Sequence, residues 1–224
     1  MIEATIYLLA IAIAEAVAVF SVPPWGILCH IAVLTVIIVR SALVNKYFHE
    51  RLMLPLALVP LLRIISLTMP LVNLPHIWLY PAIYAPLLIA AVVVVRILRY
   101  SAYDVGLNSK WLGIQLLVGA TGILLGLAGY AILRPEPIIA DFVWHEVWLP
   151  ALILLLCIGF VNEFVFRGVI QYGALEAFGG WRIVYVSLLF ATLYIGFLPV
   201  IWVAFAFVIS LYFGWIVKRT KSIL

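Results

Sequence analysis

Charged side chains are scarce in this chain of 224 residues: Lys, Arg, Asp and Glu make up 10% of it, whereas 68% of its residues are hydrophobic. A water-soluble domain typically has about 25% charged and about 45–50% apolar residues. The shortage of charge therefore excludes a soluble globule, a disordered tail and a nucleic-acid-binding module. Cysteine is also rare, and Cys29 and Cys157 both lie in apolar runs, which excludes the disulfide framework of a secreted scaffold.

What the sequence does contain is a series of long apolar runs, with a mean hydropathy of +1.29. A helix that crosses the hydrocarbon core of a bilayer needs roughly 20 apolar residues. We therefore predict an all-α integral membrane protein with about eight transmembrane helices, surrounded by the lipid bilayer. The expected spans are Ala4–Phe20, Ile27–Val44, Leu52–Val72, Ile77–Leu98, Leu112–Leu133, Trp148–Leu175, Ile183–Leu198 and Val200–Val217. No basic segment precedes the first span, so we expect it to be retained and not cleaved as a signal peptide.

Basic residues predict the orientation of these spans, because short loops rich in Lys and Arg stay in the cytoplasm. Only Arg134 falls on the side opposite the two termini. We therefore expect both termini to be cytoplasmic, in a multi-pass protein of a prokaryotic-type cytoplasmic membrane. The basic residues on the side of the termini are Arg40, Lys46, Arg51, Arg96, Arg99, Lys110, Arg182, Lys218, Arg219 and Lys221.

Two ionisable residues lie deep within the spans. Glu15 and Arg63 are each about eleven residues from the cytoplasmic start of their span, so their depths match near the midplane. We predict that they pair. A structural ion pair between two helices is the favoured interpretation, and a proton or ion relay is the alternative.

Four glycines follow one face of the expected span Leu112–Leu133, at Gly119, Gly122, Gly126 and Gly129. Small residues at this spacing allow another helix to approach closely in a membrane. We expect the stripe to be a packing face. The packed helix belongs either to this chain, which is the default, or to a partner.

Three histidines, His30, His76 and His145, map to the non-cytoplasmic side. A metal, haem or quinone site there is one interpretation, and solvated loop histidines are the other. No two of them share a helix at ligand spacing, so we expect neither a metal nor a cofactor.

The most informative stretch is Gly159–Gly168, with the sequence GFVNEFVFRG. Glu163 and Arg167 are four residues apart and share a helix face, with Asn162 beside them. Together with the later run from Ser187 to Tyr194, this stretch resembles the CPBP family of intramembrane proteases. That family includes CAAX prenyl endopeptidases and bacteriocin-processing proteins, and its motifs are EExxxR, FxxxH and HxxxN.

The resemblance extends over residues 101–224 and leaves residues 1–100 as N-terminal transmembrane helices without a signature. It places Glu163 and Arg167 on the second glutamate and the arginine of the first motif. The family's first glutamate, which is taken as the base that activates water, falls on Asn162, and the histidine of the second motif falls on Tyr194. An amide is not a base, and a phenol is a poor base at neutral pH. The third motif is expected in one further core helix, after Leu224.

Three functions are compatible with this pattern. We favour a catalytically inactive relative that binds a peptide, lipid or protein, or that serves as an accessory subunit with partner subunits in a membrane complex. The alternative is an active CAAX-type endopeptidase that cuts a lipidated or hydrophobic peptide near the cytoplasmic face. A transporter is less favoured, because the sequence shows no inverted repeat.

Overall fold

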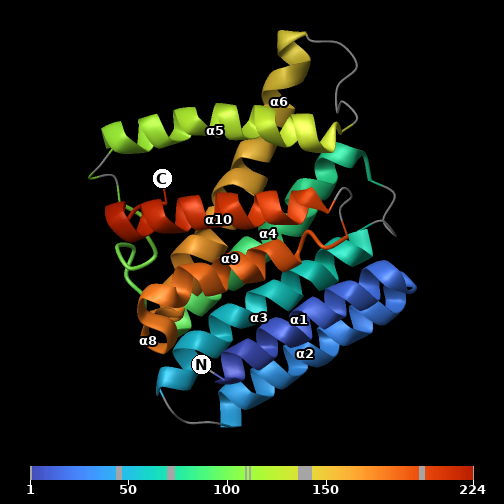
Figure 1. Cartoon of the computed structure of the whole chain (residues 1–224), viewed down its shortest axis with the longest axis vertical. Coiled ribbons are helices and arrows are strands. Elements are labelled where there is room, and N and C mark those ends of the chain that lie inside the picture. Colours follow the sequence, from blue (N-terminus) through green and yellow to red (C-terminus); the bar gives the residue numbers. More distant parts are fainter. Residues whose placement is uncertain are drawn as a thin grey trace.

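The computed structural model describes residues 2–43, 47–69, 74–108, 110, 112–135, 143–196 and 200–223. The expected span ends Val44, Val72 and Leu198, together with Lys46 and Leu224, lie outside the described residues, as does the side chain of His145. The regular elements in the described part are all helical (Figure 1). They are α1 (Ile2–Phe20), α2 (Pro23–Leu43), α3 (Tyr47–Thr68), α4 (His76–Ile97), α5 (Leu112–Leu133), α6 (Trp144–Leu154), η2 (Leu155–Val161), η3 (Phe164–Ile170), α7 (Gln171–Gly173), α8 (Leu175–Phe178), η4 (Gly179–Trp181), α9 (Arg182–Thr192) and α10 (Ile201–Thr220).

Seven helices among the described residues, not eight, are long and apolar enough to cross a membrane. They confirm an all-α integral membrane protein whose helices contact the bilayer. The difference from the expected number lies at Ile183–Leu198, where the described helix is α9, of 11 residues. At 1.5 Å per residue α9 is about 16 Å long, half of the roughly 30 Å hydrocarbon core. Most of α9 is buried inside the protein, which explains its apolar sequence.

Helices α1, α2 and α3 lie side by side at one edge of the molecule (Figure 1). Their contact faces carry fully buried aliphatic side chains, including Ile11, Ile37 and Leu56. Gly26 allows α2 to approach α1 closely, since a Cβ atom at this position would lie 2.3 Å from the Cβ of Ala18. This part of the protein is therefore packed tightly.

The segment Trp144–Gly173 is one long helical run that passes behind α5 and α10 in Figure 1. It contains two π-helical stretches, η2 and η3, with only Asn162 and Glu163 between them. A π-helical turn changes the angular position of the side chains that follow it, and such turns are frequent at functional sites. In this helix they flank the first motif.

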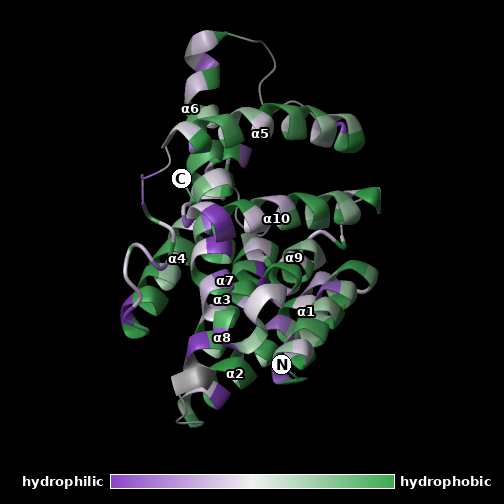
Figure 2. Cartoon of the chain, turned by 60° about the vertical axis from the view of Figure 1, so that its left-hand side comes forward, coloured by the Kyte–Doolittle hydropathy of each residue, from purple (hydrophilic) through white to green (hydrophobic). Residues whose placement is uncertain are grey.

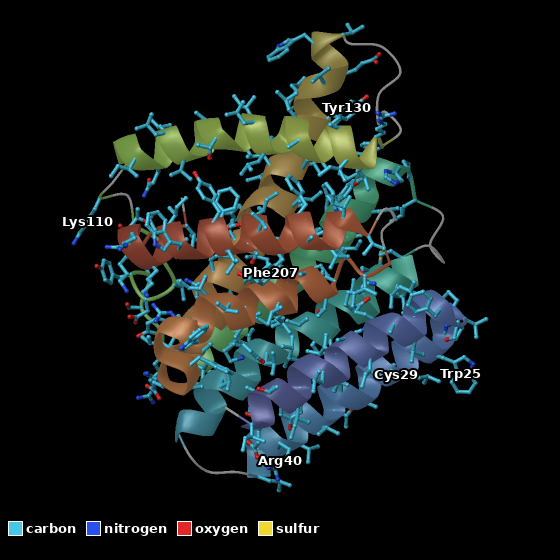
Figure 3. The ribbon with its side chains drawn as sticks, viewed as in Figure 1. Trp25, Cys29, Arg40, Lys110, Tyr130 and Phe207 are labelled. Atoms are coloured by element: carbon cyan, nitrogen blue, oxygen red, sulfur yellow. The ribbon has the colours of Figure 1, made fainter. Side chains whose placement is uncertain are left out.

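Polar contacts gather at one end of the bundle. Arg40 on α2 donates a hydrogen bond of 2.5 Å to Glu3 on α1, and Arg51 on α3 contacts Glu176 on α8 at 2.9 Å. Figure 3 places Arg40 and Lys110 toward this end and Trp25 and Tyr130 toward the other. Figure 2 shows that the walls of the helices are mostly hydrophobic. The segments that we expect on the cytoplasmic side thus lie together at one end of the bundle. Which side of the membrane this end faces stays a prediction.

Candidate functional site around Glu163

Glu163 and Arg167 contact each other within the long helix. Arg167 Nη1 lies 3.2 Å from Glu163 Oε1, and the exposed fractions of the two side chains are 1% and 24%. The contact lacks the geometry of a hydrogen bond, since neither Nε nor Nη1 of Arg167 has a hydrogen-bond partner. The pair is therefore electrostatic, with a buried guanidinium and a carboxylate that is partly open.

Aromatic rings complete the surroundings of Arg167. Its guanidinium carbon lies 4.6 Å from the centre of the Phe190 ring, within the range of a cation–π interaction. Phe190 in turn contacts Phe166 at a ring separation of 5.0 Å and Tyr194 at 5.2 Å. The structure thus brings Tyr194 into the same cluster as Arg167.

Asn162 faces a different neighbour. Its side chain is 6% exposed, and its Nδ2 donates a hydrogen bond of 3.3 Å to the hydroxyl of Tyr84 on α4. Sequence reasoning did not identify Tyr84, because nothing in the apolar run of α4 distinguishes this tyrosine from the others. The contact fixes the amide of Asn162 against α4.

A cavity of about 580 Å³ opens beside Glu163, between α5, η2 and the C-terminal half of α10. Its wall is mostly apolar, and Glu163 is the one ionisable residue among the described residues that line it. Gln115 also lines the cavity and is only 9% exposed. Its Nε2 donates to Ser222 at 2.5 Å, whereas its Oε1 has no hydrogen-bond partner. The cavity therefore suits an apolar chain that ends near a carboxylate and an amide.

The glycine stripe of α5 faces these open spaces. Gly119 and Gly122 line the cavity beside Glu163, and Gly122, Gly126 and Gly129 line a second one of about 550 Å³. A Cβ atom added at Gly119, Gly122 or Gly126 would meet nothing within 4 Å. Only Gly129 packs closely, against Trp202 and Phe205 of α10. In the described structure, then, only one of the four glycines packs against another helix of this chain, and the role of the stripe as a packing face stays a prediction.

Glu15 and Arg63 lie together between α1 and α3. Arg63 donates from Nε and Nη2 to the two carboxylate oxygens of Glu15, with 2.7 Å for the Nη2 bond. His30 on α2 is a third member of this cluster: its Nε2 lies 3.3 Å from Glu15 Oε1, and both side chains are fully buried. The sequence analysis did not place His30 there. Residues 15 and 30 are about equally far from the turn between α1 and α2, so they lie at similar depths. This spacing could have predicted the contact from the sequence. The structural role of the pair stays a prediction.

His30 is therefore a buried membrane residue and not part of a histidine cluster at the non-cytoplasmic face. Within the described residues, no group of three or more His, Cys, Asp or Glu side chains is arranged to hold a metal ion. His76 contacts Tyr80 edge to face, at a ring separation of 5.9 Å.

Comparison with known proteins gives one match. The family model described as type II CAAX prenyl endopeptidase Rce1-like matches residues 143–224. Over these residues the chain is similar to the Rce1-like family. The matched range contains α6 to α10, and thus the Glu163–Arg167 pair, Tyr194 and one wall of the cavity. No curated protein and no solved structure matches the chain.

The family match confirms the resemblance predicted from the sequence, over these residues. In chemical terms, the site offers one carboxylate at the edge of an apolar cavity. Peptide hydrolysis through water needs a general base and groups that stabilise the developing negative charge. At the motif positions of the family's first glutamate and of its histidine, this chain has the amide of Asn162 and the phenol of Tyr194.

Proposed function

We propose that this protein binds a lipidated or hydrophobic peptide in the cavity between α5 and α10 without cutting it, as a binding or accessory subunit of a membrane complex. The observation that carries the proposal is the combination of a large apolar cavity with a single ionisable residue, Glu163, in its described wall. A CAAX prenyl endopeptidase acts on a prenylated peptide, whose chain is apolar, and a cavity of this kind is suited to such a chain.

The loss of catalysis is supported by the chemistry of the motif positions. Asn162 donates to Tyr84 and has no basic atom, and Tyr194 packs among the rings of Phe190 and Trp202. Glu163 is the carboxylate that the motif retains, and Arg167 Nη1 lies 3.2 Å from its Oε1, so it is held in an ion pair. The groups that remain favour binding over hydrolysis.

Binding and cleavage are measured together with a fluorescent farnesylated peptide and the full chain in lipid nanodiscs. We expect saturable binding without a cleaved product in mass spectra. Gly122→Leu should weaken binding about tenfold, because the new side chain fills the cavity. Gly113→Leu is the matched control: it lies on the same helix, a Cβ there also meets nothing, and it does not line the cavity. Equal effects of the two substitutions would contradict the assignment of the cavity as the binding site.

An active endopeptidase is the second candidate, and it is favoured by the position of Glu163 at the cavity wall. In that case the wild-type protein would release a shortened peptide, and Glu163→Gln would abolish cleavage while binding persists. Cleavage that survives Glu163→Gln would exclude Glu163 as the base.

A further inference from the structure

A second, smaller cavity lies at the polar end of the bundle, among η3, the 101–106 segment and the last turn of α10. Its volume is about 30 Å³, enough for the oxygens of one small anionic group, since a single water needs about 10–15 Å³. The charged and amide side chains that line it are Asp104, Arg167, Gln171, Arg182, Lys218 and Lys221.

Positive charge dominates this lining, with four cationic side chains and one carboxylate. Asp104 is already engaged, because it accepts hydrogen bonds from the backbone nitrogen and the hydroxyl of Ser101 at 2.9 and 2.8 Å. Arg182 is 7% exposed, whereas Lys218 and Lys221 are exposed at the rim. The cavity therefore combines buried and accessible cations.

Two buried polar groups in this lining have atoms without a hydrogen-bond partner, although Arg167 Nη1 lies 3.2 Å from Glu163 Oε1. Arg167 is 3% exposed, and its Nε and Nη1 make no hydrogen bond. Gln171 is likewise 3% exposed; its Nε2 donates to the carbonyl of Gly214 at 3.0 Å, but its Oε1 has no partner. Leaving such groups without a hydrogen bond is unfavourable, and more so for a charged group. An anionic oxygen would satisfy Arg167, and a neighbouring hydroxyl would satisfy Gln171.

The position of the cavity indicates which kind of molecule carries the anionic group. It lies beside the C-terminal turn of α10, where Arg219 covers the ring of Trp215 at 5.5 Å, and Trp215 is 53% exposed. A tryptophan next to basic residues at the end of a span is typical of the headgroup level of a bilayer. Basic pockets at this level bind the headgroups of anionic lipids.

We propose that this cavity binds the phosphate of an anionic phospholipid with a hydroxyl-bearing headgroup, with Arg167 and Arg182 as the inner cations and Lys218 and Lys221 as the outer ones. The site adjoins the apolar chain cavity, since Val217 lines both and Arg167 contacts Glu163, but the proposal does not depend on the function proposed above.

The test measures the affinity of the full chain for dioleoyl phosphatidylglycerol by native mass spectrometry in mild detergent, with dioleoyl phosphatidylcholine as the neutral lipid. We expect phosphatidylglycerol to bind more tightly. Lys218→Gln should weaken it about fivefold, and Lys218→Gln with Lys221→Asn about 25-fold, because each basic residue near a headgroup contributes about 1 kcal/mol. Both lysines are exposed, and asparagine tolerates the positive φ of 57° at position 221.

Arg219→Gln is the matched control, since it removes the same charge from the same helix turn but does not line the cavity. It should weaken binding less than twofold. Equal weakening by Lys218→Gln and Arg219→Gln would overturn the proposal in favour of general surface attraction. Inorganic phosphate and the lipid are also compared by the rise in melting temperature that each causes. An equal rise with both would overturn the lipid as the source of the anion.

Discussion

Among the described residues, two glutamate–arginine pairs lie away from the ends of the membrane-spanning helices, and their surroundings differ. Glu15 is fully buried and receives two hydrogen bonds from Arg63, and His30 Nε2 lies 3.3 Å from its Oε1. Glu163 is 24% exposed at the wall of a cavity, and Arg167 contacts it without a hydrogen bond. The first pair is closed by its neighbours, whereas the second leaves a carboxylate available to a ligand.

The helices around the two pairs also differ in how closely other parts of the protein pack against them. Half of the α3 span is buried inside the protein, but only 6% of the α5 span. Gly26 has the backbone of Ala18 against it, whereas Gly122 faces open space. A glutamate or a glycine thus indicates structure or function only through what packs against it.

The largest expected effect is at the closed pair. Arg63→Met should lower the free energy of unfolding by about 3–5 kcal/mol, because it leaves the carboxylate of Glu15 buried without its partner. Unfolding of the detergent-solubilised protein by a denaturing surfactant, followed by circular dichroism, measures the loss.

The double variant Glu15→Gln with Arg63→Met is the control for this pair. It should be more stable than Arg63→Met alone, because no uncompensated charge remains. Losses that simply add would show that the two side chains do not stabilise each other.

Particular residues show how far the sequence could predict this structure. The spans were predictable because hydropathy is a local property, and the depths of Glu15 and Arg63 follow from the fixed rise of a helix. The short length of α9 was not predictable, because apolar residues are favoured both in the interior of a protein and in the interior of a bilayer. The direction in which Gly122 faces was not predictable either, since it depends on how far α5 stands from α10. The cavity beside Glu163 is formed by α5, η2 and α10 together, and no local pattern records that arrangement.

Next in size is the difference between the two glycines. Gly26→Ala should destabilise the protein by about 1–3 kcal/mol, because the added Cβ would overlap Ala18. Gly122→Ala should be neutral or stabilising by up to about 1 kcal/mol, since alanine favours the helix and meets nothing. The melting temperatures of both variants, measured side by side in one detergent, check the difference. A loss at Gly122 similar to that at Gly26 would mean that a neighbour covers the stripe.

A smaller effect is expected at the open pair. Glu163→Gln should lower the free energy of unfolding by about 1–2 kcal/mol, because the guanidinium of Arg167 stays buried without the carboxylate. The loss should be smaller than that of Arg63→Met, because Arg167 keeps its contact with the ring of Phe190 and loses no hydrogen bond. The same unfolding assay compares the two variants. A loss as large as that of Arg63→Met would identify Glu163 as a structural residue and remove the contrast between the pairs.

The smallest effect concerns the polar segment that joins α5 to the rest of the protein, where the backbone nitrogen of Ile223 donates to the carbonyl of Gly106 at 3.0 Å. Burial raises the pKa of Asp104, but hydrogen bonds from Ser101 to its carboxylate outweigh this and hold the pKa below its usual value of 3.8. A carboxylate with a lowered pKa stabilises the folded state above its usual pKa, and this contribution is lost as the pH falls below that value. Asp104→Asn should therefore be less stable than the wild type at pH 7, by less than about 1 kcal/mol because solvent screens the site, and the difference should shrink at about pH 3. Melting temperatures of both proteins at the two pH values test the sign: a difference that grows on acidification would mean that the protonated carboxyl group is the form that the fold prefers.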